Sequence, residues 1–500
     1  MAEAEKQKEA AAPEAEVSEL SLLDQIVEEG RFGREDEAQQ QGREMITAFV
    51  NDVLEGAITY SEDTEAMLTI QIAEIDRLVS DQLNAILHHE KFQKLEATWT
   101  GLRYLVANTE TSTMLKIRVL PISKQELLRD LTKGKAAMGV DRSEVFRKIY
   151  QDEFNVFGGT PYGAVLGDFE FDHSGPDIKL LEAMSKISAA AHAPFLTAAS
   201  ADMFGMEDLT ELNNVYALSG LFEGSQYAQW RAFRKSEDSR YVAITAPRML
   251  LREPYGKDNP IDSFDYEEAV TGKEHDQYLW GNAAWGLAAR VTGAFAQHGW
   301  CARIRGVTSG GKLEGLPVHN FETDSGDIAM KCPTETVIPD DHEMELAKLG
   351  FVPLANEKNT ANAVFFSVQS AQDPKTYIGT GGDAATANAA ISAQLPYIFA
   401  VSRFAHYLKV MMRDHIGSYK TKNDLRNMLQ NWIGEYVLKS EGASEEAKAK
   451  KPLSDARIDV IENPRAPGQY QAVAFLRPHF QLDAVDFSLR LVADVPPPRD

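Results

Sequence analysis

Cysteine and long apolar runs are both scarce in this chain. Cys301 and Cys332 are the only cysteines among 500 residues, so a disulfide framework is excluded and a reducing cytoplasm is the expected compartment. The most apolar run, 187–201, carries His192 and Pro194 and falls short of the roughly 18 apolar residues of a membrane span. Residues 1–19 lack the apolar core of a signal peptide. We therefore expect a soluble protein with no membrane anchor.

Positive charge is also in short supply. The chain has 51 Lys plus Arg against 75 Asp plus Glu, which gives a formal net charge of −24. Such a surface repels phosphate groups, so a general binder of nucleic acid or of anionic membranes is disfavoured. A hydrophobic content of 44% and a charged content of 25% are typical of globular proteins, and the length suggests about three domains.

Within the N-terminal 110 residues, we expect a disordered segment followed along the chain by helices. Residues 1–19 form an acidic tail with little to bury, which predicts disorder. Ser21 with Asp24 makes a capping-box pattern and Gly30 a stop signal, so a short amphipathic helix is predicted within 20–32. Its apolar side chains are Leu22, Leu23, Ile26 and Val27. Because so short a helix is unstable alone, it is expected to dock on its own domain or in a partner's groove.

Residues 33–110 are expected to form an N-terminal helical region. Helices are predicted over 36–54 and 64–87, with helical character continuing to about 108. Apolar residues in the second helix recur at steps of three and four, which predicts a stripe that faces a core. The stripe consists of Leu68, Ile72, Ile75, Val79, Leu83 and Ile86.

Residues 111–455 alternate short apolar runs with helical stretches. Strands are predicted over 115–120, 163–171, 195–198, 241–246 and 363–368, and helices over 178–191, 280–298 and 384–419. This alternation favours an α/β (α+β mixed) body with a mixed sheet. Pro396 is expected to kink or split the last helix. Residues 456–500 are expected to add C-terminal strands over 457–461, 470–476 and 487–492.

Two glycine-rich segments resemble nucleotide-binding motifs. Residues 306–313 nearly match a phosphate-binding P-loop, but Leu313 replaces the magnesium-binding hydroxyl and Pro317 interrupts the helix that should follow. A polar turn between strands explains the same residues. Residues 379–384 fit a loose dinucleotide fingerprint, but Pro374 separates them from the preceding strand, so a loop before a helix is the better interpretation.

Signals for catalysis or metal binding are equally weak. Cys301 with His298 lies in no nucleophile motif, and the neighbouring His88 and His89 would point about 100° apart on a helix. Acidic pairs such as Asp340 with Asp341 are common on so negative a surface. We therefore expect no catalytic residue, no metal and no cofactor, and an assembly or binding role instead.

Four long segments resemble the large subunit of the type VI secretion contractile sheath, the TssC/VipB family. They are FGGTPYGAVLGDF at 157–169, CARIRGVTSGGKLEGLP at 301–317, LGFVPL at 349–354 and LPYIFAVSRFAHYL at 395–408. The resemblance runs from about 22 to 495. It implies a structural subunit without enzymatic activity that pairs with a small subunit (TssB/VipA) in the bacterial cytoplasm. It further implies a helical lattice of such pairs around an Hcp tube, assembled on a baseplate, and disassembly by the ClpV unfoldase.

Three groups of residues fit such a role. The C-terminal strands could be completed by neighbouring subunits, with intramolecular pairing as the alternative; the candidates are Val473, Phe475, Phe487, Leu489 and Leu491. The resemblance makes the helix with Leu22, Leu23, Ile26 and Val27 the candidate site for ClpV. A basic stripe is a candidate partner face, or simply a solvated one; it consists of Arg403, His406, Lys409 and Arg413.

Two alternatives to a type VI sheath remain open from the sequence. One is a subunit of another contractile, phage-tail-like sheath. The other is a nucleotide-dependent cytosolic enzyme that uses the turn at 306–312.

Overall fold

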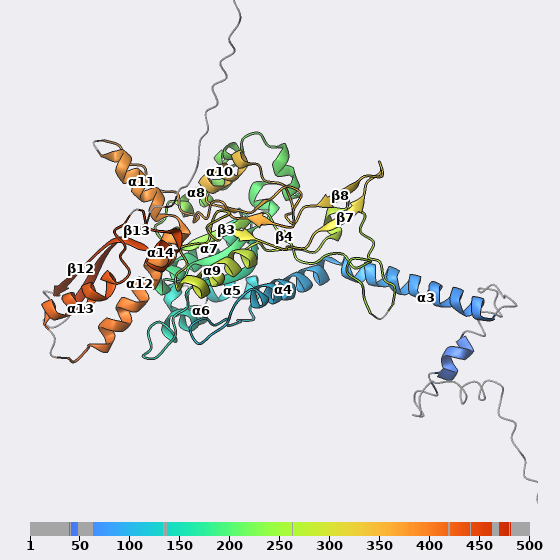
Figure 1. The fold of residues 1–500 in the computed structure, drawn as a ribbon, viewed down its shortest axis with the longest axis horizontal. Helices are drawn as coiled ribbons and strands as arrows, with labels where there is room; N and C mark the ends of the chain where they lie inside the picture. Colours follow the sequence, from blue (N-terminus) through green and yellow to red (C-terminus); the bar gives the residue numbers. More distant parts are fainter. Residues whose placement is uncertain are drawn as a thin grey trace, which may run out of the picture. The chain divides into compact units, whose positions relative to one another are not determined.

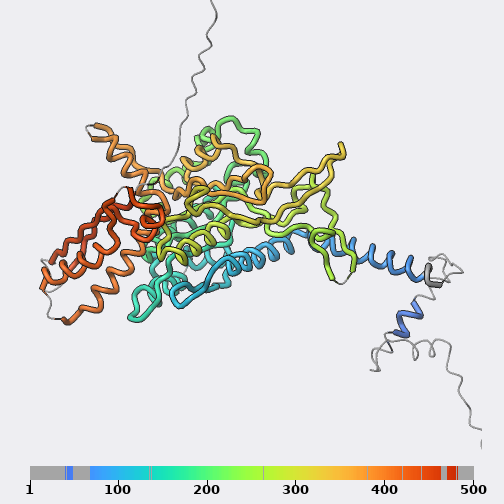
Figure 2. Tube along the Cα trace, viewed as in Figure 1, coloured from blue at the N-terminus to red at the C-terminus, as the bar shows by residue number. Residues whose placement is uncertain are grey.

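The computed structural model describes residues 40, 42–48, 64–133, 136, 138–262, 264–379, 381–418, 421–440, 442–462, 470–479 and 481. The chain forms two compact units, Met1–Leu83 with Ser263–Tyr266 and Asn84–Asp262 with Glu267–Asp500. Figures 1 and 2 trace it from blue at the N-terminus to red at the C-terminus. Within the described residues, no helix combines the length and the apolar character needed to cross a membrane.

Helix α3, Thr64–Leu87, has the bounds that the apolar spacing predicted. Arg77 stabilises it by pairing with Glu74 at 2.8 Å and with Asp81 at 2.9 Å along the helix surface. The expectation that its apolar stripe faces a core is wrong, because Ile72 and Ile75 are each 58% exposed. A helical period identifies an apolar face but does not say whether the same chain covers it. The exposed members of the predicted stripe are Leu68, Ile72, Ile75, Val79 and Ile86.

A four-stranded parallel sheet forms the centre of the larger unit, in the order β1–β2–β3–β9. Its strands are β1 (Val165–Phe171), β2 (Phe195–Ala199), β3 (Val242–Ala246) and β9 (Val352–Pro353). Both faces are apolar because helices cover both sides. Phe195 packs in the core that contains α7 (Gly175–Ala191), and Leu196 packs in the core that contains α9 (Ala284–His298). The result is an α/β/α arrangement around β1–β3.

The ends of α7 and α9 follow from local sequence. Pro176 lies in the first turn of α7, where its missing N–H has no intrahelical partner to lose. His192 ends α7 with a left-handed φ of 52°, and Gly299 ends α9 with a φ of 76°. These two stops return the chain to β2 and to the turn at 306–311.

Shorter elements surround the central sheet. The helices are α4 (Glu90–Ala107), α5 (Lys124–Thr132), α6 (Glu144–Phe146), α8 (Ala228–Arg234) and α10 (Asp340–Lys348), with a π-helical turn over Arg147–Gln151. Three small antiparallel sheets pair β4 (Met249–Leu250) with β5 (Trp280–Gly281), β7 (His319–Glu322) with β8 (Ile328–Lys331), and β11 (Ala363–Val364) with both β10 (Ala355–Asn356) and β6 (Lys312–Leu313).

The C-terminal part of the larger unit is a helical and β-hairpin module. It contains α11 (Gly382–Ser392), α12 (Leu395–Asp414), α13 (Lys422–Gly434), α14 (Glu445–Lys450), β12 (Leu453–Glu462) and β13 (Tyr470–Pro478). Figure 2 shows these segments, orange to red, gathered together. Trp300, Phe404, Leu429, Ile433 and Ile458 are buried in their shared core.

The α/β class is confirmed, with two differences in detail. The strands predicted over 163–171, 195–198 and 241–246 form β1, β2 and β3, and Pro396 separates α11 from α12 as expected. Parallel and antiparallel pairs lie in separate sheets rather than in one mixed sheet. The strand predicted over 115–120 is wrong: within the described part of the chain this segment pairs with no strand. A turn in which Ser112 accepts from the N–H groups of Met114 and Leu115 precedes it.

Candidate assembly interface

The hairpin β12–β13 presents one face to the interior and one to solvent. The antiparallel register pairs Ile458 with Ala474 and Arg457 with Phe475. Ile458 and Val460 are buried against Leu429 and Ile433 of α13, so the alternate residues must point outward. On that outer face Phe475 is 52% exposed and carries the guanidinium of Arg457 at 4.5 Å from its ring centroid.

The outer edge of β12 is closed by a side chain. The Nε2 of Gln430 donates to the carbonyl of Ala456 at 3.0 Å, and its Oε1 accepts from the N–H of Ile458 at 2.8 Å. An amide side chain thereby makes the two bonds that a neighbouring strand would make. Nearer the start of β12, Leu453 bonds to the backbone of Tyr436 and Leu438. This edge is therefore covered from within the chain.

The outer edge of β13 is the one left for another strand. Along a strand, the backbone N–H and C=O groups of successive residues point to alternate edges. The groups of Ala456 and Ile458 point toward Gln430, so those of Arg457 point toward β13 and bond to its partner Phe475. By the same alternation, the backbone groups of Ala472, Ala474 and Leu476 on β13 point away from β12, toward the outer edge. Over the described residues, no backbone bond beyond the β12 ladder satisfies these three residues.

Several predicted contact residues fall outside the described part of the chain. Two of the strand candidates, Val473 and Phe475, are described; both lie on the outer face of β13, and Val473 is half-buried. The other strand candidates and all four helix candidates lie outside the described residues: Phe487, Leu489, Leu491, Leu22, Leu23, Ile26 and Val27.

The predicted basic stripe lies on α12, and two of its members are held by the chain itself. His406 is only 3% exposed, and its Nε2 lies 2.8 Å from the carbonyl of Ala191 at the end of α7. Burial lowers the pKa of His406 to about 4, so its imidazole is neutral near pH 7. Arg403 stacks over the ring of Tyr407 at 4.7 Å.

The other two basic residues contact the segment after the π-helical turn. The Nζ of Lys409 lies 3.5 Å from the ring centroid of Phe154, and Arg413 donates to the carbonyls of Phe154 and Val156 at 3.0 and 2.8 Å. Burial, and then the charge of Arg413, lower the pKa of Lys409 to about 8, while the face of the Phe154 ring favours the cation. These contacts join α12 to the body, and a partner role for the stripe stays a prediction.

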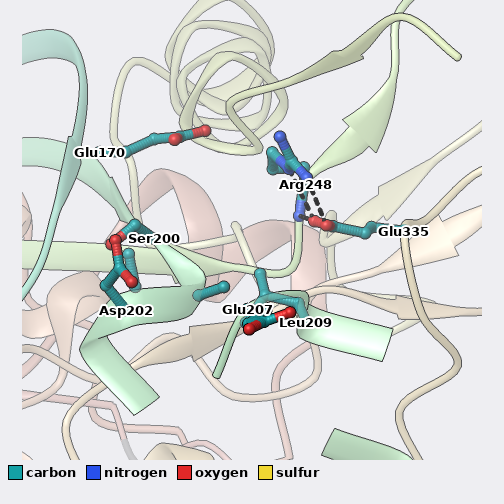
Figure 3. Close-up of a pocket in the computed structure, with 9 residues that line it drawn as sticks. Glu170, Ser200, Asp202, Glu207, Leu209, Arg248 and Glu335 are labelled. Carbon is teal, nitrogen blue, oxygen red and sulfur yellow. Dashed lines mark hydrogen bonds and ion pairs between the residues drawn. The ribbon is translucent and has the colours of Figure 1, made fainter. Parts of the chain in front are cut away.

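An acidic pocket of about 170 Å³ lies at the carboxyl ends of β1 and β2. Figure 3 shows Arg248 bonded to Glu335, with the carboxylates of Glu170, Asp202 and Glu207 standing apart from that pair. The Nε of Arg248 lies 2.9 Å and its Nη2 lies 2.5 Å from the two oxygens of Glu335. The carboxyl ends of parallel strands commonly hold ligands, which makes this pocket a candidate site.

The chemistry of the pocket is that of a structural ion pair. Burial opposes the ionisation of Glu335, but hydrogen bonds from Arg248 and His275 outweigh it and lower its pKa to about 2. Ligand atoms of Asp208, His275 and Glu335 lie within 4.8 Å of one another. The guanidinium of Arg248 already occupies both oxygens of Glu335. This ion pair joins the segment after β3 to the chain near residue 335.

The glycine-rich segments adopt the structures that the non-nucleotide interpretations predicted. The turn at 306–311 is closed by a bond from Gly311 N–H to Gly306 O at 2.9 Å, and strand β6 follows it instead of a helix. Lys312 pairs with Glu357 at 3.1 Å. Gly381, with a φ of 83°, caps the N-terminus of α11, so the second segment is a loop before a helix.

The cysteine and histidine candidates have separate partners. The thiol of Cys301 donates to Val291 O at 3.6 Å, and burial raises the pKa of Cys301 to about 12, which keeps it protonated. His88 pairs with Glu268 at 3.2 Å, whereas His89 caps α4 by accepting from Lys91 N–H. The acidic pair Asp340 and Asp341 lies in the first turn of α10.

Comparison with known proteins decides the family. The model of the EvpB/VC_A0108 tail sheath N-terminal domain (VipB) matches residues 69–372, and that of the EvpB/VC_A0108 tail sheath gpW/gp25-like domain matches 384–495. The chain belongs to the VipB tail-sheath family. A relative from Pseudomonas aeruginosa PAO1, described as type VI secretion system sheath protein TssC1, is 47% identical over 463 residues, 91% of this chain and 92% of the relative.

Two solved structures are more distantly similar to this tail-sheath protein. The anti-feeding prophage baseplate aligns with a TM-score of 0.37 at 8% identity, over 76% of this chain and 83% of that one. The contracted anti-feeding prophage helical sheath aligns with a TM-score of 0.30 at 10% identity, over 63% and 68%.

The two family domains meet between residues 372 and 384, just before α11. The hairpin and its covering helices thus lie in the second domain. Sequence reasoning singled out Val473 and Phe475 but not Gln430, which closes the β12 edge. A lone glutamine on a helix carries no sequence signal for that contact.

Proposed function

We propose that this chain is the large, structural subunit of a type VI secretion contractile sheath. In this proposal it pairs with a small sheath subunit, and the pairs polymerise as a helical lattice around an Hcp tube on a baseplate in the bacterial cytoplasm. The observation that carries the proposal is the 47% identity to a type VI sheath protein across 91% of the chain. The chain acts by changing its contacts with neighbours rather than by catalysis, so contraction draws on the free-energy difference between two lattices.

The hairpin supports a specific mode of assembly, strand addition at β13. The β12 edge is closed by Gln430, whereas the β13 edge at Ala472, Ala474 and Leu476 faces outward. Backbone bonds to an added strand keep neighbours linked while the lattice rearranges. In the proposal, the strand predicted over 487–492 completes the edge of an adjacent protomer or of the small subunit.

Deleting residues 486–500 tests the contribution of the terminal strand. The truncated chain, co-expressed with its small subunit, should give a soluble pair that forms no filaments in negative-stain electron microscopy. The full-length pair should form hollow filaments under the same conditions. Normal filaments from the truncated pair would refute strand donation by this segment.

A single substitution tests the receiving edge. Ala474→Pro removes an N–H that points away from β12, so the hairpin is retained and strand addition is blocked. Ala474→Val keeps the N–H and is the matched control. We expect Ala474→Pro to reduce the filament yield by about tenfold or more with little change in the melting temperature of the pair. Equal yields from both variants would exclude this edge.

The N-terminal segment is proposed to bind the ClpV unfoldase. Its apolar residues Leu22, Leu23, Ile26 and Val27 are spaced for a helix-in-groove contact. Leu23→Asp should leave assembly and contraction intact while reducing pull-down of ClpV on contracted sheaths. Unchanged recovery of ClpV would assign recognition to another part of the chain.

A further inference from the structure

We infer that the extended segment from Leu115 to Ile122 receives a β-strand from the small partner subunit. The segment follows the turn at Ser112 and leads into the capping box of α5, which is labelled in Figure 1. Residues 115–123 contain no helix, turn or bend, and the sequence LKIRVLPI is rich in aliphatic residues that favour strands. The inference rests on the proposed function for the existence of that subunit, and it concerns a second edge, separate from β13.

The backbone of this segment has no hydrogen-bond partner within the described part of the chain. The last backbone bond before it runs from Ser112 N–H to Leu115 O at 2.9 Å, and from Lys116 to Ile122 no backbone group bonds to a described residue. Every N–H and C=O group requires a partner, so these groups are left to solvent or to another chain. A row of such groups on extended backbone is a template for a further strand.

Side chains hold the segment in place while its backbone stays open. Ile117 packs against the core that contains α9, and Ile122 packs against the core that contains α7. The guanidinium of Arg118 donates to Thr160 Oγ1 at 3.1 Å and pairs with Glu153. A segment that is already fixed in an extended form loses little conformational entropy when a strand is added, which strengthens binding.

Exposed apolar side chains lie along the same backbone. Val119 is 65% exposed and Leu120 is 44% exposed. At the start of the segment, Met114 and Leu115 line an open groove of about 540 Å³ together with Phe295 near the end of α9. Strand addition takes its affinity from backbone bonds and its specificity from sockets for alternate side chains, and this groove provides such a socket.

Charge identifies the kind of strand that fits. Residues 113–124 contain Lys116, Arg118 and Lys124 and no acidic residue, in a chain whose net charge is −24. Within the described residues, Lys116 is exposed and forms no ion pair. A strand with acidic residues at alternate positions and apolar residues between them complements this edge. A second copy of the segment does not, because Lys116 and Arg118 of both chains would lie on one ladder and repel.

Hydrogen exchange at single-residue resolution tests the backbone pairing. In the soluble pair of full-length chain and small subunit, one alternate set of amides should exchange at least about tenfold more slowly than in an unstructured peptide. The two possible sets are Lys116, Arg118 and Leu120, or Ile117 and Val119. The other set should be less protected, because a strand added at one edge bonds to every second residue. Exchange at the unstructured rate throughout, or equal protection of both sets, would refute strand addition.

The same measurement separates the possible partners. Protection found in sedimented filaments but not in the soluble pair would assign the edge to a neighbouring pair and overturn the inference. Normal filaments with an unprotected segment would refute the inference and leave the proposed function standing. A chain that binds no small subunit at all would refute the proposed function, and the inference with it.

A charge reversal tests the chemistry of the added strand. Lys116→Glu changes an exposed side chain, so the fold is kept, and it should reduce recovery of the small subunit in a pull-down by about threefold or more. Lys358→Glu makes the same change at an exposed position between β10 and β11 and should leave recovery unchanged. Added salt should narrow the difference between the two variants. Equal recovery with both variants at low salt would exclude an acidic partner strand.

Discussion

The guanidinium of Arg457 covers the ring of Phe475, its direct cross-strand partner in the β12–β13 hairpin, at 4.5 Å from the ring centroid. The pair lies on the outer face of the hairpin, and Phe475 nevertheless remains 52% exposed. A large aromatic ring held in place but left half in water is typical of a contact surface rather than of a core.

Phe475→Asp should therefore impair assembly without unfolding the subunit. The new carboxylate can pair with Arg457, so the melting temperature of the sheath-subunit pair should stay within about 2 °C. Filament yield by electron microscopy should fall by about tenfold or more, because a charge is buried at the contact. Phe475→Leu is the control and should keep most of the yield. Wild-type yield from Phe475→Asp would place the contact elsewhere.

Gln430→Met should expose the edge of β12. The substitution retains the length of the side chain but removes both bonds, to Ala456 O and to Ile458 N–H. Loss of the two bonds should cost about 1–3 kcal/mol, and the open edge should promote self-association. Light scattering of the purified pair should rise with time for this variant. Arg426→Met, on an exposed position of the same helix, should scatter like the wild type.

Sequence periodicity predicted the positions of helices and strands in this chain better than it predicted which surfaces cover them. The spacing of Leu68 to Ile86 placed α3 correctly, and the strands predicted over 457–461 and 470–476 lie within β12 and β13, because such signals are local. Whether an apolar stripe is covered by the same chain depends on tertiary and quaternary contacts that local spacing does not encode. The exposed face of α3 is the clearest case.

The same limit explains the basic stripe and the closed edge. Positive residues on one face of α12 were visible in the sequence, but their actual neighbours, Phe154 and the carbonyl of Ala191, lie more than two hundred residues away along the chain. The bond from Gln430 to Ala456 likewise depends on how α13 packs against the hairpin. Charge and polarity patterns in the sequence identify a face of a helix, but the residues that contact this face depend on tertiary packing.

Two buried glutamates should lose different amounts of stability on the same substitution. Glu335, 4% exposed, has a pKa of about 2 because Arg248 and His275 outweigh the effect of burial, whereas burial raises the pKa of Glu343, which is 6% exposed. Glu335→Gln leaves Arg248 without its carboxylate and should cost about 3 kcal/mol. Glu343→Gln keeps an oxygen that can accept from Ser367 N–H and should cost under about 1 kcal/mol. Thermal unfolding of both variants beside the wild type measures the difference, and equal losses would contradict it.

His406 should make the protein less stable in mild acid. Its pKa is about 4 in the folded chain and 6.5 ordinarily, so between these values the unfolded chain binds a proton that the folded chain does not. Stability is therefore lost as pH falls from about 6.5 toward 4, by up to about 3 kcal/mol. His406→Gln should reduce the fall in melting temperature between pH 7.5 and 5. A pH dependence identical in the variant and the wild type would assign the loss to other groups.

The exposed stripe of α3 should act as a contact surface in the assembled sheath. Ile75 is 58% exposed on a helix whose apolar residues recur every three or four positions, a pattern that is stable in water only when another surface covers it. Ile75→Glu should increase the solubility of the chain expressed alone and reduce its recovery in filaments with the small subunit by severalfold. Ala73→Glu adds the same charge to an exposed position away from the stripe and should change neither. Both substitutions lie on the same helix at solvent-exposed sites, so a difference between them in solubility or in filament recovery can only come from the surface that covers the stripe. Equal results for the two variants would mean that α3 stays exposed in the sheath.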